Sequence, residues 1–228
     1  MEAKQNLNNL IDHTNLKNTA VSKDIDKLIS EAVEYGFHSV CINPCWVSYA
    51  RRAIDKLGAN VKVLAVIGFS LGQGKTETKV FEAKQAMQDG ADELDFLINL
   101  SFIKERRLDE LNNELKLIRE ATIGKEIKLI IENGLLDDEE KILITNLILK
   151  HNFDFVKTAT GFTQGVPGAT VEDVTLLKSI VKNKAKVKAS GGIKTYDQAL
   201  SMVKAGADRI GTSNGIAIAL GSSGTNDY

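Results

Sequence analysis

The most informative stretch of the sequence is a lysine inside a short apolar run, Phe155-Val156-Lys157-Thr158-Ala159. Runs of β-branched and aromatic residues favour β-strands because such side chains pack well on a pleated surface. If Lys157 points into the protein, its amine loses hydration, and desolvation favours the neutral form of an amine. Neutral lysines of this kind form Schiff bases with carbonyl substrates. The alternative is that Lys157 lies on an exposed strand edge and serves solubility.

A second candidate is an aspartate in the run Glu93-Leu94-Asp95-Phe96-Leu97-Ile98. Side chains of a strand alternate between its two faces, so Leu94, Phe96 and Ile98 share one face and Asp95 lies on the other. We expect Asp95 to point into the protein interior, where an unpaired charge is very costly. Asp95 therefore has either a chemical task or a place in a structural ion pair.

A second lysine, Lys188, follows Val187 near the end of another strand-like run. If Val187 packs under helices, Lys188 points inward, toward Asp95 and Lys157. A neighbouring cation favours the neutral form of the nucleophilic lysine, and a carboxylate with a second ammonium can transfer protons. The alternative is that Lys188 only neutralises Asp95.

The elements that would position these groups alternate between strand-like and helix-like runs along the chain. The candidate strands are residues 10–13, 39–43, 61–68, 93–98, 127–132, 154–158, 186–189 and 209–211. Eight strands, each followed by a helix, predict an α/β fold, a single (β/α)8 TIM barrel over residues 1–220 with a flexible tail over 221–228. An open doubly wound sheet is the alternative, but the glycine-rich fingerprint expected after its first strand is missing.

Several helix ends can be predicted from capping residues. Ser22 precedes an amphipathic run that ends at Gly36, and Asn43-Pro44 offers an N-cap with proline at the first helical position. Thr170 opens another helix, and Thr195 with Gln198 forms the pattern of a capping box.

Two glycine-bearing turns follow the last two strands, Ser190-Gly191-Gly192-Ile193 and Gly211-Thr212-Ser213. In α/β barrels the loops after strands seven and eight often bind a phosphate, and glycines let backbone N–H groups approach the anion. The sequence predicts a phosphate site made of Gly161, Gly191, Gly192, Gly211 and Ser213. The alternative is that these glycines only permit tight turns.

Composition excludes several classes of protein. The chain has 228 residues, 43% of them hydrophobic, and a formal net charge of −1, whereas nucleic-acid binders are usually strongly basic. No apolar stretch approaches the roughly 20 residues of a membrane span, and the N-terminus lacks a signal core, so we expect a cytoplasmic protein. The two cysteines and three histidines lack the spacing of a zinc site. We therefore expect no metal. We interpret Cys41 as a small residue of the hydrophobic core.

Eight motifs follow one another along nearly the whole chain, at residues 11–14, 40–44, 66–69, 90–95, 155–158, 168–174, 188–193 and 209–213. In their types and order they resemble the deoxyribose-phosphate aldolases. The resemblance implies that Lys157 forms the Schiff base, that Asp95 and Lys188 transfer protons, and that Asp12 and Cys41, with Thr158 beside the nucleophile, line the site.

The resemblance also implies a reaction, the reversible cleavage of 2-deoxy-D-ribose 5-phosphate to acetaldehyde and D-glyceraldehyde 3-phosphate, in deoxyribose phosphate catabolism. It implies no cofactor, small sugar-phosphate and aldehyde ligands, and a possible homodimer. Some family members end in a mobile tyrosine that aids proton exchange, which makes Tyr228 a possible proton relay; the alternative is a disordered tail.

Three places depart from the family pattern: Asn133-Gly134, the longer loop over residues 163–167, and Asn214. The first two could alter the fit of the substrate, and the third could weaken phosphate binding. Another lysine-dependent aldolase acting on a keto-sugar phosphate is an alternative function. A silent phosphate-binding barrel is a second alternative, but Asp95, Lys157 and Lys188 are all present.

Overall fold

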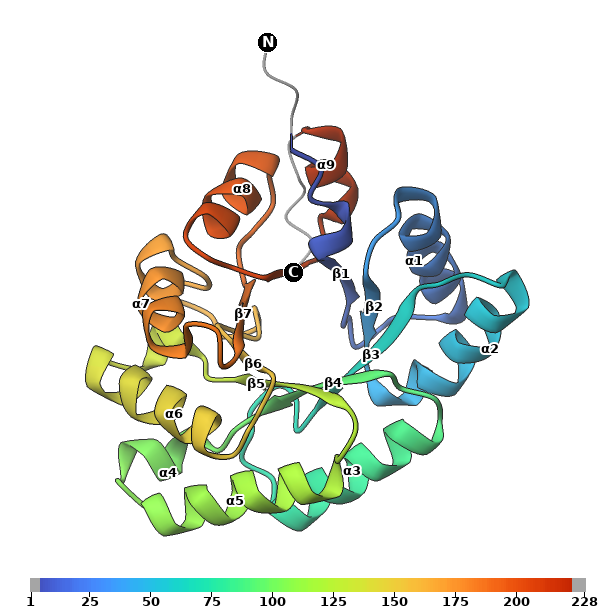
Figure 1. Ribbon diagram of the computed structural model, residues 1–228. Helices are drawn as coiled ribbons and strands as arrows, with labels where there is room; N and C mark the ends of the chain where they lie inside the picture. Colours follow the sequence, from blue (N-terminus) through green and yellow to red (C-terminus); the bar gives the residue numbers. More distant parts are fainter. Residues whose placement is uncertain (1–4, 223–228) are drawn as a thin grey trace.

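A computed structural model, which describes residues 5–222, contains eight parallel strands that close into a barrel inside a ring of helices (Figure 1). Each strand pairs with the next in chain order, and β1 pairs with β8. The strands are β1 Ile11–Asn15, β2 Ser39–Ile42, β3 Lys62–Ile67, β4 Glu93–Leu97, β5 Glu126–Ile130, β6 Phe155–Lys157, β7 Lys186–Ser190 and β8 Arg209–Thr212. The predicted (β/α)8 barrel and its eight strands are confirmed.

Helices cover the outside of the barrel and connect successive strands (Figure 1). They are α1 Ser22–Tyr35, α2 Val47–Leu57, α3 Thr76–Gln88, α4 Leu100–Lys104, α5 Leu108–Ala121, α6 Asp138–Lys150, α7 Val171–Val181, α8 Tyr196–Lys204 and α9 Gly215–Leu220. Short 3₁₀ turns are η1 Asn8–Leu10, η2 Pro44–Trp46 and η3 Asn133–Leu135.

Two of the predicted helix starts are correct and two need correction. The hydroxyls of Thr170 and Thr195 accept hydrogen bonds from backbone N–H groups in the first turns of α7 and α8. Ser22 is the first residue of α1 rather than its cap, because the chain turns at Val21, whose N–H donates to Asp24 at 2.9 Å. Asn43-Pro44 opens η2, and the α-helix begins only at Val47.

The strands sort their side chains as the alternation predicts. Leu94, Phe96 and Val187 belong to the main core between the barrel and the helices. Inside the barrel, a small apolar cluster of Leu16, Cys41, Leu64 and Val66 is separate from that core. Branched apolar residues usually fill a barrel of this kind, but here buried charges occupy much of the interior: Asp12, Glu93, Asp95, Lys128, Lys157, Lys188 and Arg209.

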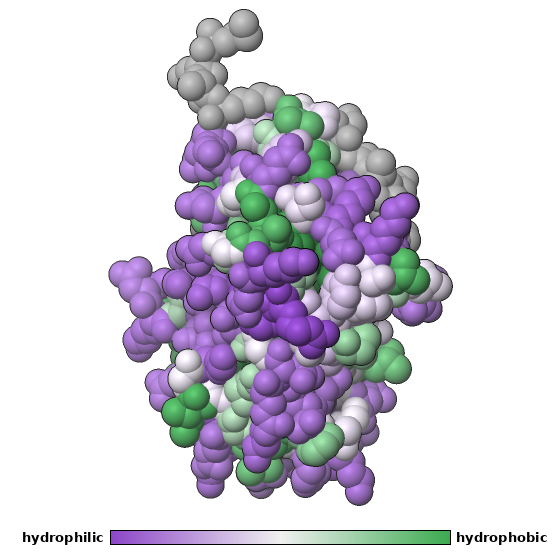
Figure 2. All heavy atoms as spheres, turned by 90° about the vertical axis from the view of Figure 1, so that its right-hand side faces the viewer, coloured by the Kyte–Doolittle hydropathy of each residue, from purple (hydrophilic) through white to green (hydrophobic). Residues whose placement is uncertain are grey.

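On the face that Figure 2 presents, the surface is mostly hydrophilic, and apolar side chains appear only in separate small groups. Single exposed apolar residues, such as Leu71 after β3, are normal for a globular protein. None of the helices between residues 5 and 222 combines the length and apolar character that a membrane crossing requires.

Candidate active site

Lys157 is the last residue of β6, and its side chain is buried in the barrel with only 3% of the residue exposed. The alternative of an exposed strand edge is therefore wrong, since β6 is paired with β5 on one side and β7 on the other. The Nζ atom of Lys157 donates a hydrogen bond to Asp95 Oδ2 at 2.8 Å. Lys157 also lines a cavity of about 210 Å³ at the mouth of the barrel.

Asp95 is the point at which the two predicted lysines meet. The Nζ atoms of Lys157 and Lys188 both lie 2.8 Å from the same Oδ2 atom of Asp95, although the three residues come from β6, β7 and β4. Burial alone would raise the pKa of the Asp95 carboxyl, but Lys157, Lys188 and Lys128 outweigh it and hold the pKa at about 2. Asp95 is therefore an ionised acceptor that holds both ammonium groups.

Lys188 lies deeper in the barrel than Lys157 and is fully buried. Its Nζ atom contacts Asp12 Oδ2 at 2.5 Å as well as Asp95. Burial opposes the charged form, but Asp12 and then Asp95 outweigh burial and raise the pKa of Lys188 well above its usual range. Lys188 therefore acts as a fixed cation and hydrogen-bond donor in this arrangement.

The cavity beside Lys157 is formed by residues at the carboxyl ends of the strands and in the loops that follow them. Its lining residues are Thr14, Leu16, Lys157, Thr160, Gly161, Phe162, Ser190, Gly191, Gly192, Ile193, Lys194, Gly211, Thr212, Ser213 and Asn214. All five residues predicted to bind phosphate are among them. The structure thus brings the candidate phosphate residues and the candidate nucleophile to one cavity.

Two of the glycines are required by close packing around this cavity. Gly191 has φ +91°, and a Cβ atom there would lie 2.9 Å from the Cα atom of Gly168. At Gly211 a Cβ atom would lie 2.9 Å from Cε of Lys188. The absence of a side chain at Gly211 therefore makes room for Lys188, which is a reason for glycine that is independent of any phosphate.

Three residues that were predicted to line the site lie behind its wall instead. Asp12 and Cys41 are buried inside the barrel below the cavity. Thr158 follows the inward-pointing Lys157, so alternation turns it away, and its hydroxyl donates to the backbone carbonyl of Ser190 at 2.9 Å. Burial raises the pKa of the Cys41 thiol, so Cys41 stays a neutral core residue. Tyr228 lies outside the described residues.

The first two departures from the family pattern contact each other. The side-chain amide of Asn133 donates to the carbonyl of Gly168 at 3.0 Å and also to Asp173. A Cβ atom at Gly134 would lie 2.5 Å from the carbonyl oxygen of Pro167, so a larger residue would collide with the end of the longer loop. Gly134 and this loop are therefore matched in shape. The third departure, Asn214, lies in the cavity wall.

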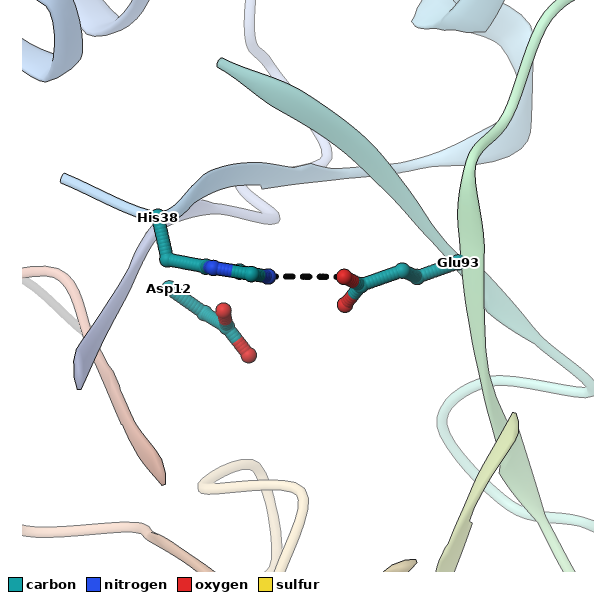
Figure 3. A group of neighbouring side chains, drawn as sticks. All are labelled: Asp12, His38 and Glu93. Carbon is teal, nitrogen blue, oxygen red and sulfur yellow. Dashed lines mark hydrogen bonds and ion pairs between the residues drawn. The ribbon is translucent and has the colours of Figure 1, made fainter. Parts of the chain in front are cut away.

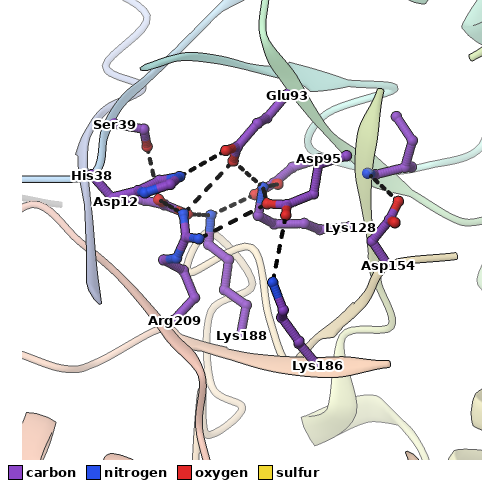
Figure 4. A network of polar contacts seen from close by, with 12 residues as sticks. Asp12, His38, Ser39, Glu93, Asp95, Lys128, Asp154, Lys186, Lys188 and Arg209 are labelled. Carbon is purple, nitrogen blue, oxygen red and sulfur yellow. Dashed lines mark hydrogen bonds and ion pairs between the residues drawn. The ribbon is translucent and has the colours of Figure 1, made fainter. Parts of the chain in front are cut away.

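Below Asp95 lies a network of buried charges (Figure 4), of which Lys128 and Arg209 were not predicted from the sequence. Lys128 of β5 contacts Glu93 at 2.5 Å and Asp95 at 3.7 Å, and Arg209 of β8 contacts Asp12 at 3.0 Å. A signal for Lys128 exists in the sequence, since the apolar residues on either side of it in β5 face the helices and leave it pointing inward. Arg209, at the start of β8, carries no comparable signal.

By ligand type, Asp12, His38 and Glu93 could form a metal site, because one donor atom of each lies within 4.8 Å of the others (Figure 3). Both carboxylates already have cationic partners: Lys188 and Arg209 hold Asp12, and Lys128 holds Glu93, which also accepts from His38 Nε2 at 2.7 Å. A metal ion placed there would be repelled by these buried cations. The group fits an ion-pair network, and we assign no metal to it.

Comparisons with known proteins agree with this geometry. The profile described as DeoC/LacD family aldolase matches residues 8–221. The "Deoxyribose-phosphate aldolase" of Streptococcus pneumoniae serotype 2 (strain D39 / NCTC 7466) is 48% identical over 222 residues, covering 97% of this chain and 99% of the relative. That of Finegoldia magna is 49% identical over 215 residues, covering 94% and 99%.

A solved structure described as the "unique tetrameric structure of deoxyribose phosphate aldolase from Aeropyrum pernix" matches the fold with a TM-score of 0.83 at 36% identity, covering 94% of this chain and 89% of that one. Profile, relatives and structure all cover nearly the whole barrel, including every strand that carries the buried charges. The chain belongs to the DeoC/LacD family of aldolases.

Proposed function

We propose that this aldolase reversibly cleaves 2-deoxy-D-ribose 5-phosphate to acetaldehyde and D-glyceraldehyde 3-phosphate through a Schiff base on Lys157. The relatives named above carry the name of that activity. The observation that carries the proposal is that Lys157 shares its cavity with Gly161, Gly191, Gly192 and Ser213. A ligand with a carbonyl at one end and a phosphate at the other can engage both.

The reaction begins when Lys157 transfers a proton and its neutral nitrogen attacks the C1 aldehyde of the open-chain sugar. Asp95 Oδ2, 2.8 Å away, is placed to take that proton. The carbinolamine loses water to give an iminium ion. A base then removes the proton of the C3 hydroxyl, the C2–C3 bond breaks, and its electrons move to the iminium nitrogen. The enamine that forms replaces a far less stable carbanion.

The second half of the reaction returns the proton. C2 of the enamine is protonated, water hydrolyses the resulting iminium, and acetaldehyde leaves Lys157. Asp95 is the proton carrier in this scheme, and Lys188 keeps Asp95 oriented through its hydrogen bond at 2.8 Å. General acid–base catalysis of this type typically contributes about 10²–10⁴ in rate.

The phosphate is assigned to the turns after β6, β7 and β8. Gly161, Gly191 and Gly192 have positive φ angles, which bring successive backbone N–H groups into concave arrangements that suit an anion. Ser213 adds a hydroxyl donor, and Lys194 adds a cationic side chain to the same cavity wall. A sugar phosphate would therefore lie with its phosphate at these turns and its aldehyde at Lys157.

Borohydride trapping tests the proposal directly. With acetaldehyde or deoxyribose 5-phosphate, reduction should attach a two-carbon or sugar adduct to the peptide that contains Lys157, and Lys157→Ala should give none. An adduct on another lysine, or an equal yield in the variant, would overturn the assignment. Dihydroxyacetone and pyruvate as donors separate this activity from that of other lysine-dependent aldolases.

The assembly and the compartment of the protein remain predictions. We expect a homo-oligomer, as small as a dimer, since a homologue is described as tetrameric. Sedimentation velocity at micromolar concentration measures the mass, and a monomer would contradict the expectation. Cytoplasmic location is likewise expected from the sequence and is tested by fractionation of the source cells.

A further inference from the structure

We propose that Lys128 is a positioning residue for the aldol reaction, which it serves by holding the Asp95 carboxylate in its working orientation. Lys128 lies in the middle of β5, in register with Asp95 on β4, and is fully buried. It is not among the residues that line the cavity, so it cannot touch a substrate there. Any effect of Lys128 on catalysis must therefore pass through another residue. This inference rests on the proposed function.

The two oxygens of Asp95 have different surroundings. Oδ2 accepts hydrogen bonds from Lys157 and Lys188, both at 2.8 Å. Oδ1 accepts no hydrogen bond from any described residue, and the Nζ atom of Lys128 lies 3.7 Å from it. Lys128 thus supplies a positive charge on the side of Oδ1, which keeps Oδ2 turned toward the two lysines above.

Lys128 also separates two buried carboxylates. Its Nζ atom lies 2.5 Å from Glu93 Oε2 and 3.5 Å from Glu126 Oε1, and the ammonium sits 5.3 Å from the centroid of the Phe155 ring. Figure 4 shows Lys128 reaching between Glu93 and Asp95. Glu93 and Asp95 lie two residues apart on the same face of β4. Without this cation they would repel each other, and Asp95 would be pushed out of its orientation.

The consequence for the reaction is a loss of turnover without a loss of binding. Lys128 has no contact with the candidate phosphate residues, so a change at Lys128 should leave the affinity for sugar phosphate intact. A displacement of about 1 Å at a catalytic group can cost about 10²-fold in rate. We therefore expect Lys128→Met to lower kcat about 10–100-fold while KM stays within about twofold.

The experiment compares four proteins in the coupled cleavage assay: wild type, Lys128→Met, Asp95→Asn and the double variant. If Lys128 acts through Asp95, the substitution at Lys128 should lower kcat in the wild type but change it less than about threefold once Asp95 is already neutral. Lys186→Met is the matched control. Lys186 also lies over the Phe155 ring, at 5.1 Å, but is half exposed and pairs with Glu126, so its loss should leave kcat unchanged.

A folded Lys128→Met with wild-type kcat, or an equal loss of kcat in the Asp95→Asn background, would overturn the positioning role. If Lys128→Met does not fold by circular dichroism, Lys128→Gln, whose amide can hydrogen-bond to Glu93, is judged by the same criteria. A wild-type protein that does not cleave deoxyribose 5-phosphate would overturn the proposed function first, and this inference with it.

Discussion

Replacing Lys188 with methionine should abolish most of the aldol cleavage and leave the barrel folded. Lys188 contacts Asp12 at 2.5 Å and Asp95 at 2.8 Å. After the substitution, Asp12 still has Arg209 at 3.0 Å and Asp95 still has Lys157 at 2.8 Å. Neither buried carboxylate is left without a cation, and methionine fills most of the volume of the lysine.

The size of the stability change follows from these remaining contacts. Breaking a buried pair so that one charge is unpaired costs about 3–5 kcal/mol. Because each carboxylate keeps a partner, we expect Lys188→Met to cost only about 1–3 kcal/mol. A domain typically has about 5–15 kcal/mol of stability, so the variant should stay folded. Its kcat should fall by up to the contribution of proton transfer, about 10²–10⁴, because Asp95 loses the hydrogen bond from Lys188 that orients it.

The measurements are the coupled cleavage assay and urea unfolding of the same preparation. Lys178→Met is the control, since it removes an ion pair at 2.8 Å to Asp208 that lies outside the barrel, where both partners are about one third exposed. The control should keep wild-type kcat. A Lys188→Met protein that is folded and fully active would refute the role of Lys188 in orienting Asp95, and one that is unfolded would refute the argument from shared partners.

Two further predictions concern the surroundings of the same carboxylate. The pKa of Asp95 is lowered to about 2 from an ordinary 3.8. The ionised carboxylate therefore contributes about 2 kcal/mol of stability, which is present above pH 4 and is lost as the pH falls toward 2. The urea midpoint of unfolding, measured from pH 6 to pH 2, should fall less in Asp95→Asn than in the wild type. Gly211→Ala would place a Cβ atom 2.9 Å from Cε of Lys188. We expect kcat to fall at least tenfold, while the midpoint of thermal unfolding, measured on the same sample, drops by only a few degrees. An unchanged kcat would mean that Lys188 has room to move.

Much of the fold and of the site could be predicted because barrels repeat one local pattern. Each strand shows apolar residues at alternate positions or in a short run, so the eight strands were found within one or two residues. The same alternation placed Asp95 and Lys188 on the inner face. Side-chain parity is a property of the strand itself, and closure of the barrel does not change it.

The sequence could not show which inward residues meet across the barrel. Asp95 and Lys188 are separated by 93 residues and lie on β4 and β7, and the distance between them depends on the stagger of all the strands between. For the same reason the pairing of Asp12 with Lys188 and Arg209 was missed. Asp12 was expected at the cavity wall, but Thr14, two residues further along the same face of β1, lines the cavity instead.

The charge of Lys188 persists throughout the reaction, whereas the charge of Lys157 changes. This difference explains how Asp95 can interact with both lysines and stay in place. Lys157 is cationic as an ammonium and as an iminium, but neutral as the attacking amine and as the enamine. Whenever Lys157 is neutral, Asp95 would lose its hydrogen-bonded cation if Lys188 could also lose its proton. Asp12 prevents that, because it raises the pKa of Lys188 well above its usual range. The sequence suggested two lysines that share the work of proton transfer; the geometry favours one lysine that changes charge and one that is kept from doing so.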